Sequence, residues 1–144
     1  MQSLCLLCFV TARELPINKA YTYHWSQQPH TAPSRSIKIT DTTNFPISND
    51  ISAALVAIEP GAMRELHWHL ASDEWNHFLQ SSARITVCMA PQSSRTFDYT
   101  AGDVGYIPAS NFHYIENTGT KNVIFLEVLK QPKLEILVLH KGWL

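Results

Sequence analysis

The sequence has few cysteines and no cluster of basic residues, and both absences narrow the classes of protein that it can encode. Its three cysteines are an odd number without a regular spacing to histidine, which argues against a disulfide framework. A formal net charge of -1 without any Lys/Arg cluster gives no electrostatic footprint for nucleic acid. We therefore expect small molecules as partners, and no nucleic acid.

The chain is also too short for a large or divided architecture. Its 144 residues suffice for one hydrophobic core but not for two barrels. We expect a single domain at residues 21–144 after an N-terminal extension at 1–20. Residues 1–12 are apolar and end in a Val-x-Ala that resembles a signal-peptidase site, so the extension is a candidate targeting remnant. However, this stretch lacks a basic segment and cannot span a bilayer, so secreted and cytoplasmic locations both stay open and no membrane partner is expected.

Long amphipathic helices, internal repeats and low-complexity tracts are missing as well, and short strand-like segments take their place. These segments follow one another at about ten-residue spacing, with Gly, Pro and Asn between them. They cover residues 36–40, 51–58, 63–69, 74–80, 83–88, 96–99, 104–107, 111–116, 122–129 and 134–139. Eight or more such strands predict an all-β fold, a jelly-roll β-barrel.

Three histidines and one glutamate are spaced as the ligands of a single metal ion would be. Side chains two apart on a strand share a face, so His67 and His69 can point into a barrel while Trp68 points out. A turn at 70–73 would return the chain and place Glu74 beside them. His113 belongs to a later strand-like segment that barrel closure would bring to the same place.

The combination of motifs is more informative than any one histidine. A lone histidine on an apolar strand is more often a core or surface group than a ligand. Here His-x-His is followed by Glu after five residues and by a Gly-x5-Pro-x4-His-x3-Asn stretch, which would rarely coincide by chance. Four other histidines match no part of this pattern, and we interpret them as core or surface residues. They are His24, His30, His77 and His140.

The ligand types narrow the choice of metal. Three imidazole nitrogens and one carboxylate, with no thiolate, leave positions free for water or substrate in an octahedral sphere. This set favours Mn or Fe over a closed structural Zn site. Affinity alone would not exclude Zn or Cu.

Several further motifs lie between residues 21 and 127. They are 26–28 (SQQ), 41–46 (DTTNFP), 59–69 (EPGAMRELHWH), 95–99 (RTFDY), 101–106 (AGDVGY) and 114–117 (YIEN). Through these motifs, residues from about 21 to 127 resemble the second cupin half of the microbial two-cupin oxalate decarboxylases. The resemblance implies the cupin barrel, or double-stranded β-helix. In that family, Mn bound by three His and one Glu converts oxalate to formate and carbon dioxide with dioxygen as a helper oxidant. The resemblance thus implies that His67, His69, Glu74 and His113 bind Mn.

The same resemblance gives Arg64 and Glu127 catalytic roles. Arg64 matches the family's substrate arginine, three residues before the first ligand. A divalent metal with one carboxylate carries about +1, and Arg64 would raise this to about +2, the opposite of the oxalate dianion. Strict alternation puts Arg64 on the other face from His67 unless the strand bulges, so a surface salt bridge, with Glu65 for example, is the alternative.

Glu127 matches a glutamate of the family that is proposed as the proton donor. Making formate requires a proton from a nearby acid after the C–C bond breaks. Glu127 lies in the apolar run 123–129, where desolvation would favour the protonated acid. A carboxylate paired with Arg64 or another cation is the alternative.

The sequence departs from its relatives at several points. Ser81 replaces a glycine, so a tight turn there would need a serine in the left-handed conformation. Phe112 replaces a glycine before the last ligand, where its bulk could hinder substrate access. This chain has one cupin instead of two, and exposed barrel surface would then favour a homo-oligomer. Oxalate oxidase chemistry, a metal-binding cupin without turnover and a truncated two-cupin protein are the open alternatives.

Overall fold

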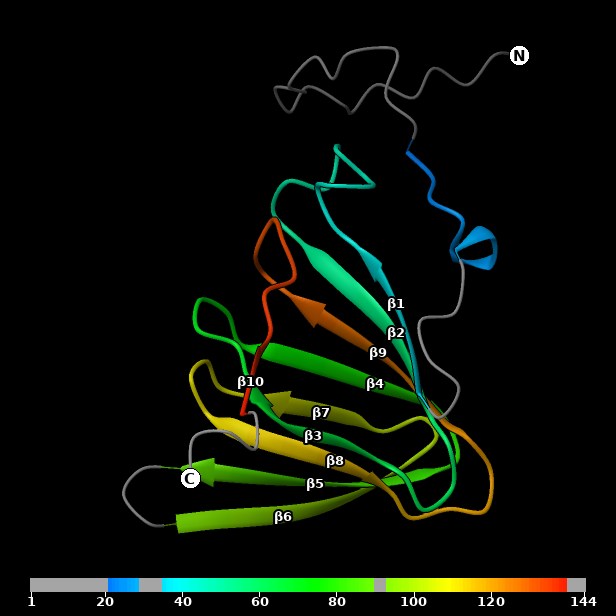
Figure 1. Cartoon of the computed structure of the whole chain (residues 1–144), viewed down its shortest axis with the longest axis vertical. Helices are drawn as coiled ribbons and strands as arrows, with labels where there is room; N and C mark the ends of the chain where they lie inside the picture. The colour runs from blue at the N-terminus through cyan, green and yellow to red at the C-terminus, as the bar shows by residue number, and fades with distance from the viewer. Residues whose placement is uncertain (1–20, 29–34, 90–92, 140–144) are drawn as a thin grey trace, which may run out of the picture.

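The computed structural model describes residues 21–28, 35–89 and 93–139, which form two antiparallel five-stranded sheets (Figure 1). The first sheet has the strand order β1-β2-β9-β4-β7 and the second β10-β3-β8-β5-β6. One 3-10 turn, η1 (Trp25–Gln27), precedes them. This architecture confirms the prediction of an all-β jelly-roll barrel.

Each of the predicted segments overlaps an observed strand. The first sheet contains β1 (Arg35–Thr40), β2 (Ser52–Ile58), β4 (Glu74–Gln80), β7 (Val104–Ile107) and β9 (Val123–Leu129). The second sheet contains β3 (Met63–Trp68), β5 (Ser82–Met89), β6 (Ser93–Thr100), β8 (Phe112–Asn117) and β10 (Leu137–Val138).

The largest difference concerns the last strand, which was predicted over 134–139. Its first part bonds elsewhere: the backbone N–H of Leu134 donates to the Asp41 carboxylate, and the carbonyl oxygen of Glu135 lies 2.7 Å from His69 Nδ1. Only Leu137 and Val138 pair with β3. The strand is therefore short because its neighbouring backbone groups hold other parts of the barrel.

The barrel interior changes from apolar to polar along two neighbouring strands. Both β2 and β9 bury every second residue, as expected for strands with one face toward a core. The buried aromatic rings of Phe78 on β4 and Phe125 on β9 lie 5.4 Å apart within this core. Asn76, two residues before Phe78, and Glu127, two residues after Phe125, form the next inward pair of these antiparallel strands, and both are fully buried. The polar part of the interior is where the candidate site lies.

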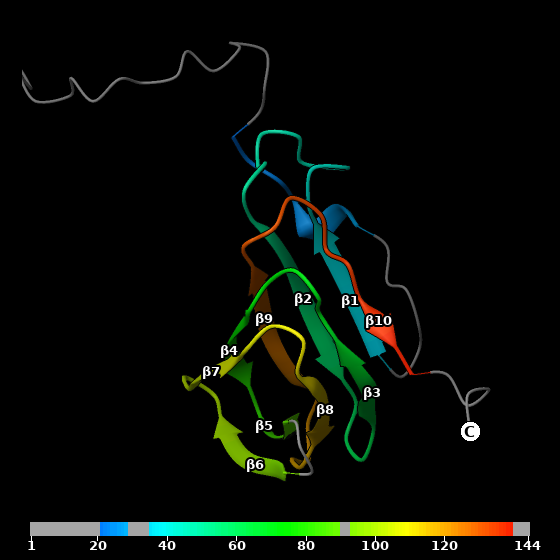
Figure 2. The ribbon, with the colours of Figure 1, turned by 90° about the vertical axis from the view of Figure 1, so that its left-hand side faces the viewer.

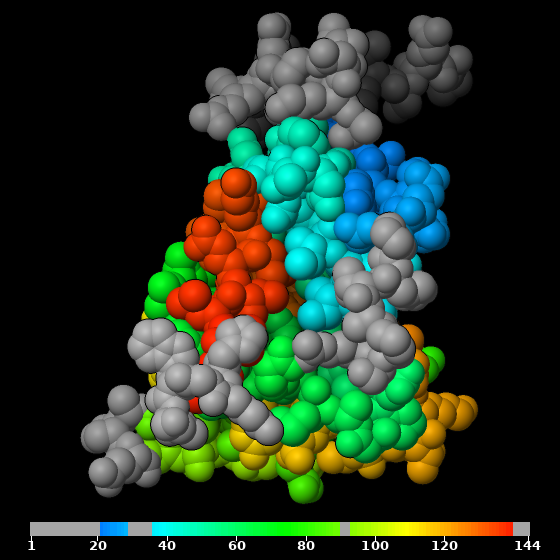
Figure 3. All heavy atoms as spheres, in the orientation of Figure 1, coloured from blue at the N-terminus to red at the C-terminus, as the bar shows by residue number. Residues whose placement is uncertain are grey.

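Two loops meet at one end of the barrel (Figures 1 and 2). The backbone N–H and the hydroxyl of Thr42 both donate to the carbonyl oxygen of Pro132, at 2.9 Å and 3.0 Å. Figure 3 shows residues 130–139 (orange to red) lying against the cyan residues that surround β1. These contacts fix the segment that follows β9 against the start of the barrel.

The turn at Ser81 has the conformation predicted from the sequence. Ser81 joins β4 to β5 with φ 68°, in the left-handed region that usually favours glycine. The predicted N-terminal extension at 1–20 lies outside the described residues, so the division at residue 21 stays a prediction. None of the helices in the described residues is long and apolar enough to cross a bilayer.

Candidate metal centre

The His-x-His motif lies where β3 ends. His67 and His69 are buried, whereas Trp68 between them is half-buried on the outer side of the sheet. This is the alternation predicted from the sequence, although β3 itself ends at Trp68. The backbone around His69 is held in place by Ser110, whose N–H donates to the His69 carbonyl oxygen at 2.8 Å.

A short, tightly bonded loop carries the chain from His69 to Glu74, the first residue of β4. The hydroxyl of Ser72 accepts from the backbone N–H of Lys130 at 2.8 Å, and the Asp73 carboxylate accepts from the N–H of Ala109 at 2.8 Å. These bonds tie the loop to the end of β9 and to the loop before β8. These two bonds therefore hold in place the loop that leads to Glu74.

His113 completes the set from β8. It lies opposite His67 in the β3–β8 pair, and their ring centroids are 4.0 Å apart. Glu74 Oε2 lies 3.0 Å from Nε2 of both His69 and His113. One ligand atom from each of the four residues falls within 4.8 Å of the others, and all four side chains are buried. The fold thus brings the four residues of the predicted pattern together.

Backbone carbonyl groups determine which imidazole nitrogen faces the centre. His67 Nδ1 lies 2.8 Å from the carbonyl oxygen of Glu65, and His113 Nδ1 lies 3.1 Å from that of Asn111. His69 Nδ1 contacts the Glu135 carbonyl in the same way. A carbonyl oxygen only accepts, so each Nδ1 carries a proton and Nε2 is left as the donor atom for a metal.

The atoms that face the centre have no hydrogen-bond partners among the described residues. They are Nε2 of His67, His69 and His113 and Oε2 of Glu74. Lone pairs crowded around one point in a buried place repel each other unless a metal ion or a proton lies between them. Three nitrogens and one oxygen in this arrangement fit a divalent transition metal.

The charges around the centre keep two of the candidate ligands in the protonation states that bind a cation. Burial raises the pKa of Glu74, but the imidazoles of His113 and His69 and the charge of Arg64 outweigh it and hold the pKa well below its ordinary value. Burial lowers the pKa of His67 far below its ordinary value, and Arg64 lowers it further. Glu74 is therefore ionised and His67 neutral at physiological pH, the forms in which each binds a metal.

His69 differs from His67 because two carboxylates face it. Its Nε2 lies 3.0 Å from Glu74 Oε2 and 3.3 Å from Glu127 Oε1. Burial lowers the pKa of His69, but Glu127 and Glu74 outweigh this effect and raise the pKa to about 9. A metal binding at Nε2 must consequently displace a proton at neutral pH.

Arg64 points into the barrel despite its odd spacing from His67. The β3–β8 register shifts between Arg64 and His67, which marks an irregularity of the kind that a β-bulge makes. Arg64 is buried, so the alternative of a surface salt bridge is wrong. Its guanidinium Nη1 donates to Glu127 Oε2, and its Nη2 has no hydrogen-bond partner within residues 21–28, 35–89 and 93–139.

Glu127 is fully buried, as its apolar surroundings in the sequence predicted. It forms the ion pair with Arg64 that was the alternative to a free acid. Burial lowers the pKa of Arg64, but Glu127 and Glu74 outweigh this effect and raise it above its ordinary value. Glu127 Oε1 faces the centre and lies 3.3 Å from His69 Nε2. Both Arg64 and Glu127 thus border the candidate metal centre.

Asn76 also belongs to this site, and the sequence reasoning missed it. Asn76 is fully buried on β4, and its Nδ2 donates to Glu74 Oε1 at 2.8 Å. This bond occupies one carboxylate oxygen and leaves Oε2 toward the histidines. The sequence does contain a pattern that predicts this position. Glu-x-Asn opens the predicted strand at 74–80, and residues two apart on a strand share a face, so Asn76 points inward with Glu74.

Other residues considered in the sequence lie away from the site. Phe112 packs on Trp68 with ring centroids 4.5 Å apart on the outer side of the second sheet, so it does not fill the interior. His77 follows the outward pattern of β4. His30 and His140 lie outside the described residues.

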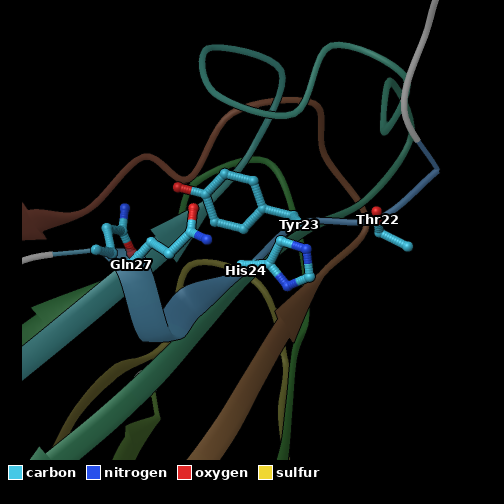
Figure 4. A pocket seen from close by; sticks show the side chains of 5 residues that line it. Thr22, Tyr23, His24 and Gln27 are labelled. Carbon is cyan, nitrogen blue, oxygen red and sulfur yellow. The ribbon is translucent and has the colours of Figure 1, made fainter.

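His24 contributes to a separate pocket of about 400 Å³ beside η1. Figure 4 shows Tyr23, His24 and Gln27 around it, and none of the candidate ligands lines it. The pocket is fixed to β1 through the main chain of Trp25, whose carbonyl oxygen accepts from Lys38 Nζ at 2.9 Å. It is distinct from the metal centre.

Comparisons with known proteins agree with this geometry. A family model described as cupin matches residues 27–142. Oxalate decarboxylase OxdC of Bacillus subtilis is 43% identical over 125 residues, which are 86% of this chain and 32% of that protein.

Solved structures give the same result. A structure of the Bacillus subtilis oxalate decarboxylase with Mn(II) centres has a TM-score of 0.83 at 40% identity, covering 90% of this chain and 35% of the other. The formate complex of Lactobacillus farciminis oxalate decarboxylase has a TM-score of 0.82 at 43% identity, covering 85% and 37%. The chain spans about a third of the length of the relatives it matches.

Proposed function

Because the chain belongs to the cupin family, we propose that His67, His69, Glu74 and His113 bind Mn and that the site converts oxalate to formate and carbon dioxide. The observation that carries this proposal is the convergence of four buried ligand atoms within 4.8 Å. Fe and Zn suit the same donors and remain alternative metals. The similarity to oxalate decarboxylases supports the choice of Mn and of oxalate.

The bound metal would supply a Lewis acid that holds and polarises a carboxylate of the substrate. We propose that Arg64 orients the second carboxylate through Nη2, which has no hydrogen-bond partner in the part of the chain that the structure describes. Arginine suits this role because its fixed donor geometry matches a carboxylate. Glu127 is the acid in this proposal, since its Oε1 faces the same interior, 3.3 Å from His69 Nε2.

The Arg64–Glu127 pair changes the charge expected from the sequence. The metal, Glu74 and Arg64 would give about +2, but an ionised Glu127 reduces this to about +1. A proton on Glu127 restores the higher charge and releases Arg64 from its ion pair. Both charges are positive and attract a dianionic substrate, and Glu127 beside the centre is placed to give up a proton in the proposed step.

A metal-binding cupin without turnover is the second candidate function. The observation in its favour is that the matched relatives are about three times as long as this chain. Parts of an active site that lie in the remaining two thirds of those relatives would have to come from elsewhere. The four candidate ligands would bind a metal in either case.

One experiment tests the proposal. Bound Mn, Fe and Zn are quantified in the purified chain, and formate and hydrogen peroxide are measured in the same sample after addition of oxalate, with and without dioxygen. We expect about one Mn per chain and oxygen-dependent formate. Peroxide in place of formate would indicate oxalate oxidase chemistry, and metal without either product would indicate a binding protein.

Two matched variants serve as controls. His67→Ala removes a candidate ligand and should abolish both metal binding and formate production. His77→Ala removes a histidine from the outer side of β4 and should change neither. Equal metal content in His67→Ala and the unmodified chain would overturn the proposed site.

A further inference from the structure

Residues 130–139, here called the strap, cross from the end of β9 in the first sheet to β10 at the edge of the second (Figures 1 and 2). The carbonyl oxygen of Glu135 in the strap lies 2.7 Å from His69 Nδ1. A hydrogen bond to the outer nitrogen of a candidate ligand fixes the orientation of its ring. Whatever holds the strap therefore acts on the metal centre as well.

The strap is anchored at its two ends. At the start, the backbone N–H of Lys130 donates to the hydroxyl of Ser72 at 2.8 Å. At the other end, β10 pairs with β3. Glu135 lies between these anchors, in a stretch that is not part of a strand. Its position consequently depends on what holds the middle of the strap.

The turn after β1 holds the middle of the strap. The carboxylate of Asp41 accepts from the backbone N–H of Leu134 at 3.4 Å. The N–H and the hydroxyl of Thr42 both donate to the carbonyl oxygen of Pro132, at 2.9 Å and 3.0 Å. Two adjacent residues thus bond to backbone groups of the strap just before Glu135.

This turn is itself well ordered by hydrogen bonds. The other carboxylate oxygen of Asp41 accepts from the backbone N–H of Thr43 at 2.8 Å, the pattern of an Asx turn. The carbonyl oxygen of Asp41 accepts from the N–H of Phe45 at 2.7 Å. Asp41 is only 9% exposed, so water competes little for its carboxylate. The turn therefore offers the strap a fixed and largely buried acceptor.

A void borders the same part of the strap. Its volume is about 310 Å³, and it is lined by Leu70, Glu135, Ile136 and Leu137. Side chains beside a void lack the contacts that would otherwise resist a displacement. Leu134 does pack against the hydrophobic core, but only from one side. The bonds from Asp41 and Thr42 are thus needed to fix the backbone around Glu135.

We propose that Asp41 is a positioning residue for the metal centre and acts on His69 through the strap. The carboxylate holds the Leu134 N–H, and this fixes the Glu135 carbonyl that accepts from His69 Nδ1. Nε2 of His69 is thereby directed toward the other candidate ligands. The inference rests on the proposed metal site, but the positioning itself exists without metal and is measurable there.

NMR of the metal-free chain tests the positioning directly. At pH 7 the unmodified chain should show a downfield, slowly exchanging Nδ1–H resonance that is missing from His69→Gln. Asp41→Asn keeps the shape of the side chain but cannot accept from both Leu134 and Thr43. We expect the exchange of the Nδ1 proton to accelerate about tenfold in this variant, because local opening of the strap frees it.

Metal binding provides the second measurement. Chelator competition should show that Asp41→Asn binds Mn about three- to tenfold more weakly, less than the 10- to 100-fold typical of losing the partner of a ligand itself. The electron paramagnetic resonance spectrum of bound Mn(II) should also change. Thr42→Val removes one hydroxyl bond to the strap and should shift both measurements in the same direction, and it serves as the test if Asp41→Asn does not fold.

Asp98→Asn is the matched control, because it removes the same charge and breaks a hydrogen-bonded pair with Arg84 on the other sheet. It should leave the proton exchange and the Mn affinity unchanged. Unchanged exchange in Asp41→Asn, a bound metal with unchanged affinity in that variant, or an equal loss in Asp98→Asn would overturn the inference. If the unmodified chain bound no metal but Asp41→Asn accelerated the exchange, the metal-site proposal would fall and the positioning of His69 by Asp41 would stand.

Discussion

Asn76 donates a 2.8 Å hydrogen bond to one oxygen of Glu74 and leaves the other oxygen 3.0 Å from two imidazoles. The bond forms within one strand, where residues two apart share the inward face. It restricts rotation of the carboxylate and favours binding through a single oxygen. Asn76 is thus a positioning residue for the candidate metal centre.

Replacing Asn76 with Leu should lower the affinity for Mn by about 10- to 100-fold, the usual effect of losing a partner that orients a metal ligand. The free energy of unfolding without metal should also fall, by roughly 1 to 3 kcal/mol, because the buried Oε1 of Glu74 loses its hydrogen-bond donor. Chelator competition measures the affinity, and chemical denaturation measures the stability. Asn122→Ala, at an exposed position, is the control. Unchanged affinity in Asn76→Leu would remove Asn76 from the site.

Replacing Glu127 with Gln should abolish most formate production and preserve metal binding. The proposed proton transfer contributes about 10²- to 10⁴-fold to the rate, and Gln cannot supply it. Breaking the buried ion pair with Arg64 should also lower the free energy of unfolding by about 3 kcal/mol. Steady-state formate assays and metal analysis are compared in the same preparation. Unchanged turnover would exclude Glu127 as the acid.

Metal binding should strengthen as the pH rises. The pKa of His69 is raised to about 9 when no cation is bound, so a metal must displace its proton. Between pH 6 and 8 the affinity should increase about tenfold per pH unit, and one proton should be released per metal. Calorimetric titration in two buffers of different ionisation enthalpy counts that proton. A constant affinity over this range would contradict the assignment.

The same raised pKa has the opposite effect on the metal-free fold. A histidine whose pKa is higher in the folded state than its ordinary value of about 6.5 stabilises the fold fully below that value. The stabilisation is lost as the pH rises through about 9. The metal-free chain should therefore lose stability between pH 6.5 and 9, and a His69→Asn variant should lack this dependence.

Removing the metal should lower the melting temperature. A ligand at 100 times its dissociation constant stabilises the folded state by about 2.7 kcal/mol. For a chain of this length, that corresponds to roughly 5 to 10 °C. Differential scanning calorimetry with and without a chelator measures the shift. His67→Ala should not respond to the chelator, and an equal shift in that variant would point to a different site.

Local spacing was enough to predict the four candidate ligands. His67 and His69 follow strand alternation, and Glu74 follows a loop of four residues, so short-range geometry brings these three together. His113 could be added because its flanking residues matched a motif.

Three features of the structure depend on contacts between residues far apart in the chain, and local spacing could not predict them. The inward direction of Arg64 depends on a register shift against β8, about fifty residues away in the chain. The pairing of Arg64 with Glu127 likewise requires β3 and β9 to meet across the barrel, and the sequence left it as one of two alternatives. The shortening of β10 depends on bonds to Asp41 and His69 that no local pattern contains.

Ser81 offers a test of backbone conformation that is independent of the metal. Its φ of 68° is tolerated by serine but is costly for a β-branched residue. Ser81→Val should lower the free energy of unfolding by about 1 to 2 kcal/mol. Ser81→Gly should be nearly neutral, because the relief of strain is offset by the greater freedom of glycine in the unfolded chain.

Ser94→Val is the matched control for this substitution. Ser94 is exposed on β6, where a β-branched residue suits the extended backbone, so stability should stay the same or rise slightly. Urea denaturation of the three variants and the unmodified chain gives the comparison. If Val were equally well tolerated at both positions, the left-handed turn at Ser81 could not be the constraint, and the glycine of the relatives would need another explanation.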